Sequence, residues 1–120
     1  MIRKEIRSFG HAFRGLKFLF QSQKHFRFHV LAGIGVSSIG LATGFTVLEW
    51  AIVLLCIGAV MMAEALNSAL EVLMDKLHPE QDPMIGKAKD MAAAGVLIVA
   101  MISLVIALIV IVPHLIMYCG

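Results

Sequence analysis

Hydrophobic and polar positions divide this chain into one amphipathic segment and three long apolar stretches. The first and third stretches, Val30 to Leu48 and Met91 to Val112, contain nineteen and twenty-two residues without a charge. The second begins at Trp50 and stays uncharged for fourteen residues, until Glu64. Because about 20 apolar residues cross a hydrocarbon core, this pattern predicts three transmembrane helices. The predicted helices cover residues 29–48, 50–75 and 90–113.

The segment before the first stretch has the periodicity of an amphipathic helix. Its apolar residues recur every three or four positions and are surrounded by Lys and Arg: Ile2, Ile6, Phe9, Phe13, Leu16 and Phe20. Next to a membrane, such a helix lies in the interface, with its basic residues at the lipid headgroups. The alternative is a helix packed on a partner domain, which this short chain does not supply. We therefore expect a surface helix over residues 1–28.

Composition and charge agree with a membrane protein and predict its orientation. The chain is 60% hydrophobic, with a mean hydropathy of +0.92, whereas soluble domains are about 45–50% apolar. Seven of the ten Lys and Arg precede the first stretch, and the other three lie at positions 76–90. By the positive-inside rule, the N-terminus and the 76–90 loop are cytoplasmic. We expect one all-α, multi-pass domain, residues 1–120, in the cytoplasmic (inner) membrane.

The second stretch enters a run of acids and amides that share one side of a helix. At about 100° per residue, Glu64, Asn67, Glu71 and Asp75 fall within a stripe roughly 80° wide. A carboxylate at membrane depth costs about 2.5–3.5 kcal/mol on insertion scales. Glu64, flanked by apolar turns, is therefore a candidate functional residue. Glu71 could equally be an interfacial ion-pair partner, and Asp75 a solvated helix end.

Helical rise gives each of these acids a depth. Glu64 lies about 21 Å along the axis from Trp50, some two-thirds of the way across, and Glu71 lies about 31 Å along, at the cytoplasmic boundary. This descent from water into lipid suits a reaction between a soluble reactant and a lipid. Glu71 could bind a divalent cation, Glu64 could act as a general base, and Asn67 could hold a hydroxyl or orient Glu64.

Small residues indicate close helix packing, because they let backbones approach. Two faces carry them: Gly33, Ser37, Gly40 and Gly44 in the first stretch, and Ala93, Ala100 and Ala107 in the third. Since three helices cannot enclose several carboxylates alone, we expect a homo-oligomer.

These patterns leave two functions open. An enzyme of the membrane interface would use the acidic face, but an ion-coupled oligomeric transporter could use Glu64 equally well. There is no Walker A pattern and no protein-kinase glycine loop. Nothing in the pattern indicates a nucleic-acid partner.

Two blocks of sequence decide between these functions by resemblance. They are Glu64-Ala65-Leu66-Asn67-Ser68-Ala69-Leu70-Glu71 with Asp75, and Gly86-Lys87-Ala88-Lys89-Asp90-Met91-Ala92-Ala93. Together they resemble the prokaryotic diacylglycerol kinase and undecaprenol kinase family of small integral-membrane lipid kinases. A weaker block, Phe26-Arg27-Phe28-His29, is similar to the family's sequence before the first span.

The resemblance implies a homotrimer of three-span subunits with active sites shared between neighbours. It implies ATP and Mg²⁺ as cofactors and a lipid alcohol as substrate, either diacylglycerol or undecaprenol. Glu64 corresponds to the catalytic base, Asn67 to its positioning partner and Glu71 to a Mg²⁺ ligand at the nucleotide. Glu64, Asn67 and Ala93 are the substrate-binding candidates.

The resemblance also supplies the remaining site candidates. The nucleotide-binding set is Glu71, Lys89, Asp90, Glu80, Asp82, Lys4 and His11. One position departs from the family, because Gln23 stands where better-known members carry a second metal-binding Glu. A carboxamide oxygen can coordinate Mg²⁺ but brings no charge.

Overall fold

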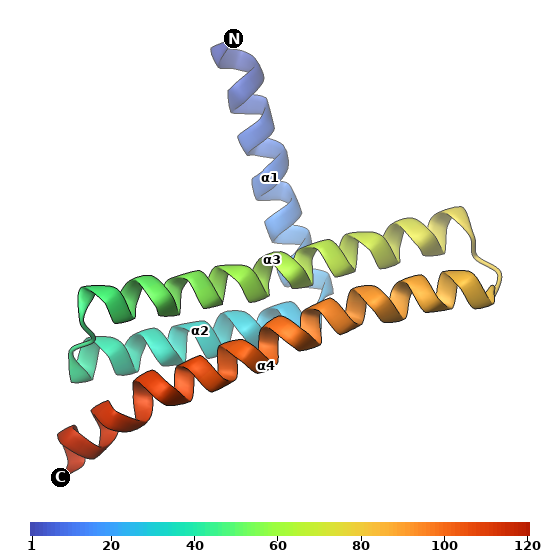
Figure 1. Cartoon of the computed structure of the whole chain (residues 1–120). Coiled ribbons are helices and arrows are strands. Elements are labelled where there is room, and N and C mark those ends of the chain that lie inside the picture. The colour runs from blue at the N-terminus through green and yellow to red at the C-terminus, as the bar shows by residue number, and fades with distance from the viewer.

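The computed structural model describes all 120 residues and contains only helices. They are α1 (Ile2–Ser22), α2 (Lys24–Thr43), α3 (Val47–Leu77) and α4 (Pro83–Cys119). The last three lie side by side in an elongated bundle, and α1 projects away from it at a steep angle (Figure 1). These three are long and apolar enough to cross a membrane. The predicted all-α architecture, with three spans and an N-terminal amphipathic helix, is confirmed.

The corner between α1 and α2 lies earlier than predicted, at Gln23 rather than near residue 28. Gln23 has an extended backbone, with φ −113° and ψ 109°. The Arg27 guanidinium donates hydrogen bonds of 3.1 and 3.0 Å to the carbonyls of Phe20 and Gln21. A cation at these unpaired carbonyls stabilises the negative end of α1. Arg27 thus holds the corner, and α2 begins at Lys24.

The turn between α2 and α3 also differs from the prediction. α2 ends at Thr43 because Gly44 adopts a left-handed conformation, with φ +84°, and closes the helix. The predicted face of small residues therefore ends at Gly40, and its inclusion of Gly44 is wrong, since Gly44 lies in the turn. Thr46 and Glu49 form a reciprocal capping box that starts α3.

Helix α4 begins at Pro83, seven positions before the predicted start of the third span. The Asp82 carboxylate accepts hydrogen bonds from the amides of Met84 and Ile85, at 2.8 and 3.3 Å. Pro83 occupies the first turn, where its missing amide hydrogen costs nothing. The ends of α3 and α4 are thus helical on both sides of a short loop.

Small residues of α2 pack against other parts of the same chain. Gly33 lies against Ile57 of α3, and Gly40 lies against the rings of Phe45 and Trp50. The buried core beside them is small: Phe45, Val53 and Val110. Only nine of the 120 residues are buried, so most apolar side chains of the bundle face outward. Such a surface suits helices surrounded by lipid or by other subunits.

We expect Gly40→Ala to destabilise the bundle. A Cβ at this position would lie 2.5 Å from Cδ2 of Phe45 and 2.9 Å from the Trp50 ring. Overpacking of this kind costs about 1–3 kcal/mol, which thermal unfolding in detergent would register as a lower midpoint. Gly35→Ala is the matched control, because nothing lies within 4 Å of its new Cβ. Equal midpoints for the two variants would contradict the proposed packing role.

Candidate active site

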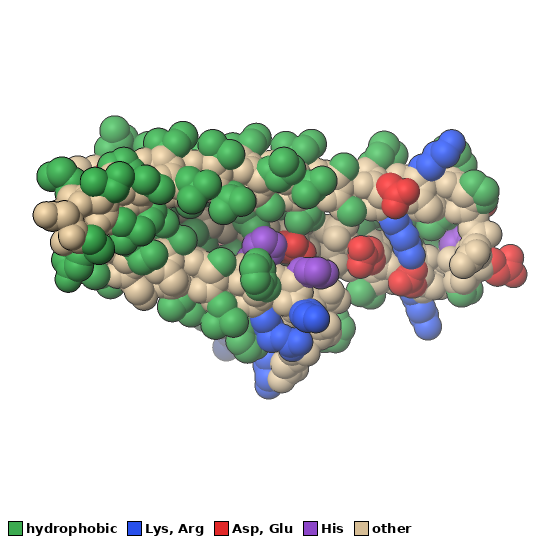
Figure 2. Space-filling view, turned by 90° about the horizontal axis from the view of Figure 1, so that it is seen from below, with side chains coloured by type: hydrophobic (Ala, Val, Ile, Leu, Met, Phe, Trp, Pro, Cys, Tyr) green, Lys and Arg blue, Asp and Glu red, His purple; other side chains and the backbone are tan.

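The polar face of α3 descends from an exposed helix end to a buried carboxylate. Asp75 is exposed, Glu71 and Asn67 are half-buried, and Glu64 is buried together with Ser68. Figure 2 shows the charged and histidine side chains gathered toward one part of the molecule, while the opposite end is largely hydrophobic. Along α3 the side chains become less exposed from Asp75 to Glu71 and then to Glu64. This is the order of depth expected from helical rise.

Glu64 has one polar partner, His29 of α2. The His29 Nε2 lies 3.2 Å from the Glu64 Oε1, within ion-pair distance, and the two side chains are 21% and 8% exposed. His29 was not among the predicted site residues. It stood in the Phe26-Arg27-Phe28-His29 block, but no local pattern shows that this position of α2 faces position 64 of α3.

Asn67 is joined to Glu71 rather than to Glu64. Its amide nitrogen donates a hydrogen bond of 3.3 Å to the Glu71 Oε1. The Asn67 carbonyl oxygen is buried and has no hydrogen-bond partner. Because unpaired buried acceptors are uncommon and costly, this oxygen is a candidate contact for a bound reactant or cation.

Lys89, which belongs to the sequence block from Gly86 to Ala93, contacts the acidic face of α3. Its ammonium forms an ion pair with the Asp75 carboxylate, which joins α4 to α3 beyond Glu71. Asp90, the next residue of α4, is exposed. Asp82 and Glu80 lie in the connecting loop, where the Asp82 carboxylate caps α4 and Glu80 is exposed.

Other predicted residues form no hydrogen bond or ion pair with this face in a single chain. Lys4 and His11 are exposed on α1, which leads away from the bundle (Figure 1). Gln23 is half-buried at the corner and makes no side-chain hydrogen bond. Ala93 is exposed on α4. The chain by itself therefore joins α2, α3 and α4 at the site but not the N-terminal part of α1.

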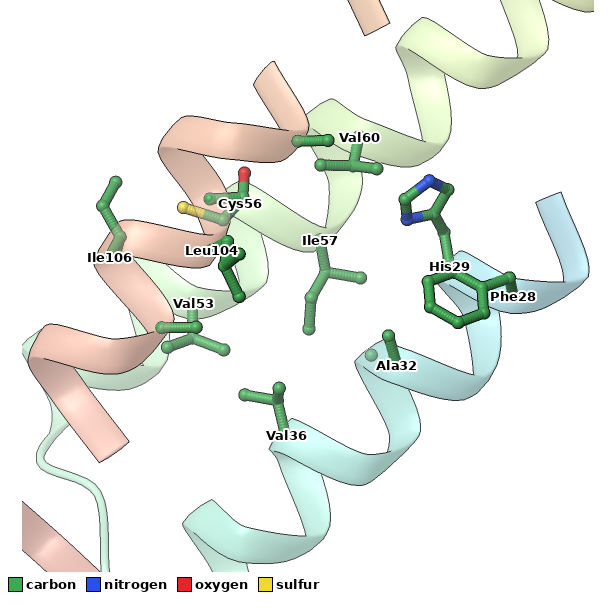
Figure 3. A pocket seen from close by; sticks show the side chains of 14 residues that line it. Phe28, His29, Ala32, Val36, Val53, Cys56, Ile57, Val60, Leu104 and Ile106 are labelled. Atoms are coloured by element: carbon green, nitrogen blue, oxygen red, sulfur yellow. The ribbon is translucent and has the colours of Figure 1, made fainter. Parts of the chain in front are cut away.

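An apolar cavity of about 390 Å³ lies between the three long helices (Figure 3). Its lining is mostly hydrophobic and includes Ile57 and Val60 of α3 and Leu104 of α4. His29 belongs to the same lining, so one side chain both borders the cavity and approaches Glu64. A space of this size and polarity is suited to a hydrocarbon chain.

The oxygen atoms on α3 fit a hard cation such as Mg²⁺. Glu71 supplies a carboxylate, and the unpaired Asn67 carbonyl lies on the same face. No three carboxylate, histidine or cysteine side chains of this chain converge. Mg²⁺ typically uses one or two protein carboxylates and completes its shell with phosphate oxygens and water. The residues present therefore fit a cation that is carried with a nucleotide.

The acid at the other end of the bundle has a structural partner. The Glu49 Oε1 lies 2.8 Å from the Nε2 of His114, which ties the start of α3 to α4. The Phe45 ring packs beside both Trp50 and His114, with centroids 5.3 and 5.0 Å apart. Glu49 is thus paired for packing, whereas the face from Glu64 to Asp75 retains an unpaired acceptor.

Known proteins match the chain over nearly its whole length. A family model described as prokaryotic diacylglycerol kinase matches residues 10–111, which include every candidate site residue except Lys4. The chain is 33% identical to an undecaprenol kinase of Bacillus subtilis over 95% of this chain and 93% of that protein. It is 27% identical to a diacylglycerol kinase of Escherichia coli K12, over 83% and 82% of the two chains. A diacylglycerol kinase of Synechocystis is 31% identical over 82% of this chain and 57% of its own length.

Proposed function

Because this chain belongs to the prokaryotic diacylglycerol kinase family and is a lipid kinase, we propose that it transfers the γ-phosphoryl group of ATP to the hydroxyl of diacylglycerol or undecaprenol. The observation that supports this reaction is the position of Glu64. It is a buried carboxylate beside an apolar cavity, on a helix face that continues to the exposed Asp75. Such a face can bring a lipid hydroxyl next to the phosphate groups of a soluble nucleotide.

In this proposal, Glu64 accepts the proton of the lipid hydroxyl as that oxygen attacks the phosphoryl group. The oxygen–phosphorus bond to the lipid forms while the bond to the leaving diphosphate breaks. General-base help of this kind contributes about 10²–10⁴-fold in rate. Asn67 fixes the Glu71 carboxylate through its amide, and its buried carbonyl oxygen, which has no partner, is the proposed contact for a reactant.

When bound, Mg²⁺ with ATP supplies the phosphoryl group and neutralises its developing charge. Glu71 and the Asn67 carbonyl are the proposed cation ligands, and Gln23 is a further oxygen donor at the α1–α2 corner. Lys89 and Asp90 are the proposed nucleotide contacts next to Asp75. Glu80 and Asp82 would lie at the outer edge of the nucleotide site.

The arrangement of α1 supports sites shared between subunits. Lys4 and His11 lie on a helix that leads away from the acidic face of its own chain. If these residues contact the nucleotide, they do so at a neighbouring subunit. The outward apolar surface of the bundle can pack against such neighbours. We propose a homotrimer in which Ala93 also borders the lipid.

Orientation follows from the charges and from the site. Seven of ten Lys and Arg lie on α1 and the first turn of α2, and the other three, Lys76, Lys87 and Lys89, lie at the ends of α3 and α4 toward which the acidic face runs. We therefore propose a cytoplasmic membrane location with the N-terminus and the active site on the cytoplasmic side. Nothing in the structure favours the transporter alternative, and the family is one of kinases.

The purified chain in lipid vesicles, given Mg²⁺ and γ-labelled ATP, is expected to label a lipid alcohol. Diacylglycerol and undecaprenol are supplied in parallel at equal mole fraction, and labelled phospholipid products are separated by thin-layer chromatography. Label in either product supports the proposal and identifies the preferred lipid. Transfer to neither alcohol, with ATP present in excess, would contradict it.

A further inference from the structure

Glu64 is the least exposed carboxylate of the polar face, and its surroundings offer few groups to hold it. On its own helix the adjacent turns carry Val60, Asn67 and Ser68, and the Asn67 amide is committed to Glu71. From α2, the His29 Nε2 approaches to 3.2 Å, and α4 contributes no ion-pair partner. A carboxylate at this depth that must meet a hydroxyl needs a fixed direction, and His29 is the side chain that contacts it.

We propose that His29 is the positioning residue of the lipid kinase reaction and orients the Glu64 carboxylate toward the substrate hydroxyl. This role rests on the proposed function of Glu64. When the imidazole nitrogen that faces Glu64 carries its hydrogen, it donates to Oε1, and Oε2 is left to accept the hydroxyl proton. Hydrogen bonds of catalytic groups are often imperfectly aligned before the reactants bind, so the observed 3.2 Å approach is compatible with this role.

The cavity explains why the positioning group comes from α2. His29 is part of the cavity lining and its ring lies on the side of α2 that faces α3, near Val60 (Figure 3). A hydrocarbon chain in this space would place its polar end near the residue that holds Glu64. Binding of the hydrocarbon chain and orientation of the Glu64 carboxylate thus both involve His29.

The experiment compares His29→Leu with His29→Gln in the vesicle assay. Leucine preserves an apolar wall but removes the donor, and we expect kcat to fall by about 10- to 100-fold, since misplacement of a reacting group by 1 Å can cost about 100-fold. The KM for ATP should stay within about twofold, because His29 contacts Glu64, which lies about two helical turns from Glu71 on α3. Glutamine can place an amide donor near the position of Nε2, so His29→Gln should recover most of the lost kcat.

A double-mutant cycle distinguishes positioning from general packing. Glu64→Asp withdraws the carboxylate from His29 by one methylene and keeps a base, so activity remains measurable. If His29 acts through Glu64, His29→Leu in the Glu64→Asp background should lower kcat by less than about threefold further. His25 lies one turn before His29 on α2, and its side chain is exposed. His25→Leu is therefore the matched control and should keep wild-type kcat.

The outcomes separate this inference from the function on which it rests. A wild-type chain that phosphorylates no lipid overturns the proposed function, and the role of His29 with it. An active wild type with unchanged kcat in His29→Leu overturns only the role of His29. Full additivity in the double mutant, or a loss that His29→Gln does not recover, assigns His29 to packing and likewise overturns the inference.

Discussion

Glu64→Gln is expected to lower kcat for lipid phosphorylation by about 10²–10⁴-fold, which corresponds to about 2.7–5.4 kcal/mol of lost transition-state stabilisation. The carboxamide has the size of the carboxylate and can still accept a hydrogen bond from His29, so the bundle should remain folded. It cannot accept the proton of an attacking hydroxyl. The expected loss is therefore in chemistry, while nucleotide binding at the proposed site of Glu71, Lys89 and Asp90 should remain.

Steady-state rates with labelled ATP measure this loss, and binding of a fluorescent ATP analogue measures the nucleotide affinity separately. The affinity should stay within about threefold of wild type, because the substitution lies two helical turns from Glu71. Thermal unfolding in detergent checks that the variant is folded. A kcat within tenfold of wild type would remove Glu64 as the general base and leave it a structural acid.

The second large effect is expected from Glu71→Gln, which should lower kcat/KM for ATP at fixed Mg²⁺ by about 10²–10³-fold. Loss of one preorganised electrostatic group at a transferring phosphoryl group has an effect of this order. The glutamine carbonyl can still accept the Asn67 amide hydrogen, so the local hydrogen bond of 3.3 Å is preserved. What disappears is the negative charge that would attract the cation.

A Mg²⁺ titration at constant ATP tests this assignment directly. We expect half-maximal activity to require more Mg²⁺ in Glu71→Gln than in the wild-type chain, because a neutral oxygen binds a hard cation less tightly. Glu5→Gln is the matched control, since Glu5 is an exposed acid in the first turn of α1. An unchanged Mg²⁺ requirement in Glu71→Gln would exclude Glu71 as a cation ligand.

Some helix ends of this chain are specified by local sequence signals, and one depends on a contact between helices. Asp82 followed by Pro83 is a recognisable start signal, and Thr46 with Glu49 is a recognisable capping box, so these boundaries could have been predicted. The α1–α2 corner could not, because it depends on the Arg27 side chain folding back onto carbonyls of the preceding helix. Hydropathy placed the helices correctly but not their ends.

The small residues of α2 illustrate a different limit. Their spacing indicates only that something packs closely against this side of the helix. In the structure, Gly33 and Gly40 admit Ile57, Phe45 and Trp50 of the same chain, and Gly44 closes the helix. Packing within a chain and packing between chains require the same small residues, so the pattern alone could not tell them apart.

The sequence by itself determined the number of membrane helices, the amphipathic character of α1 and the single polar face of α3, because these depend on hydrophobicity and on the constant geometry of a helix. It also predicts that Glu64 lies deeper in the membrane than Glu71 and Asp75. The tertiary structure decided which groups these side chains meet: His29 for Glu64, Asn67 for Glu71 and Lys89 for Asp75. Two of these three contacts join different helices, and their register is set by how the helices pack rather than by any local pattern.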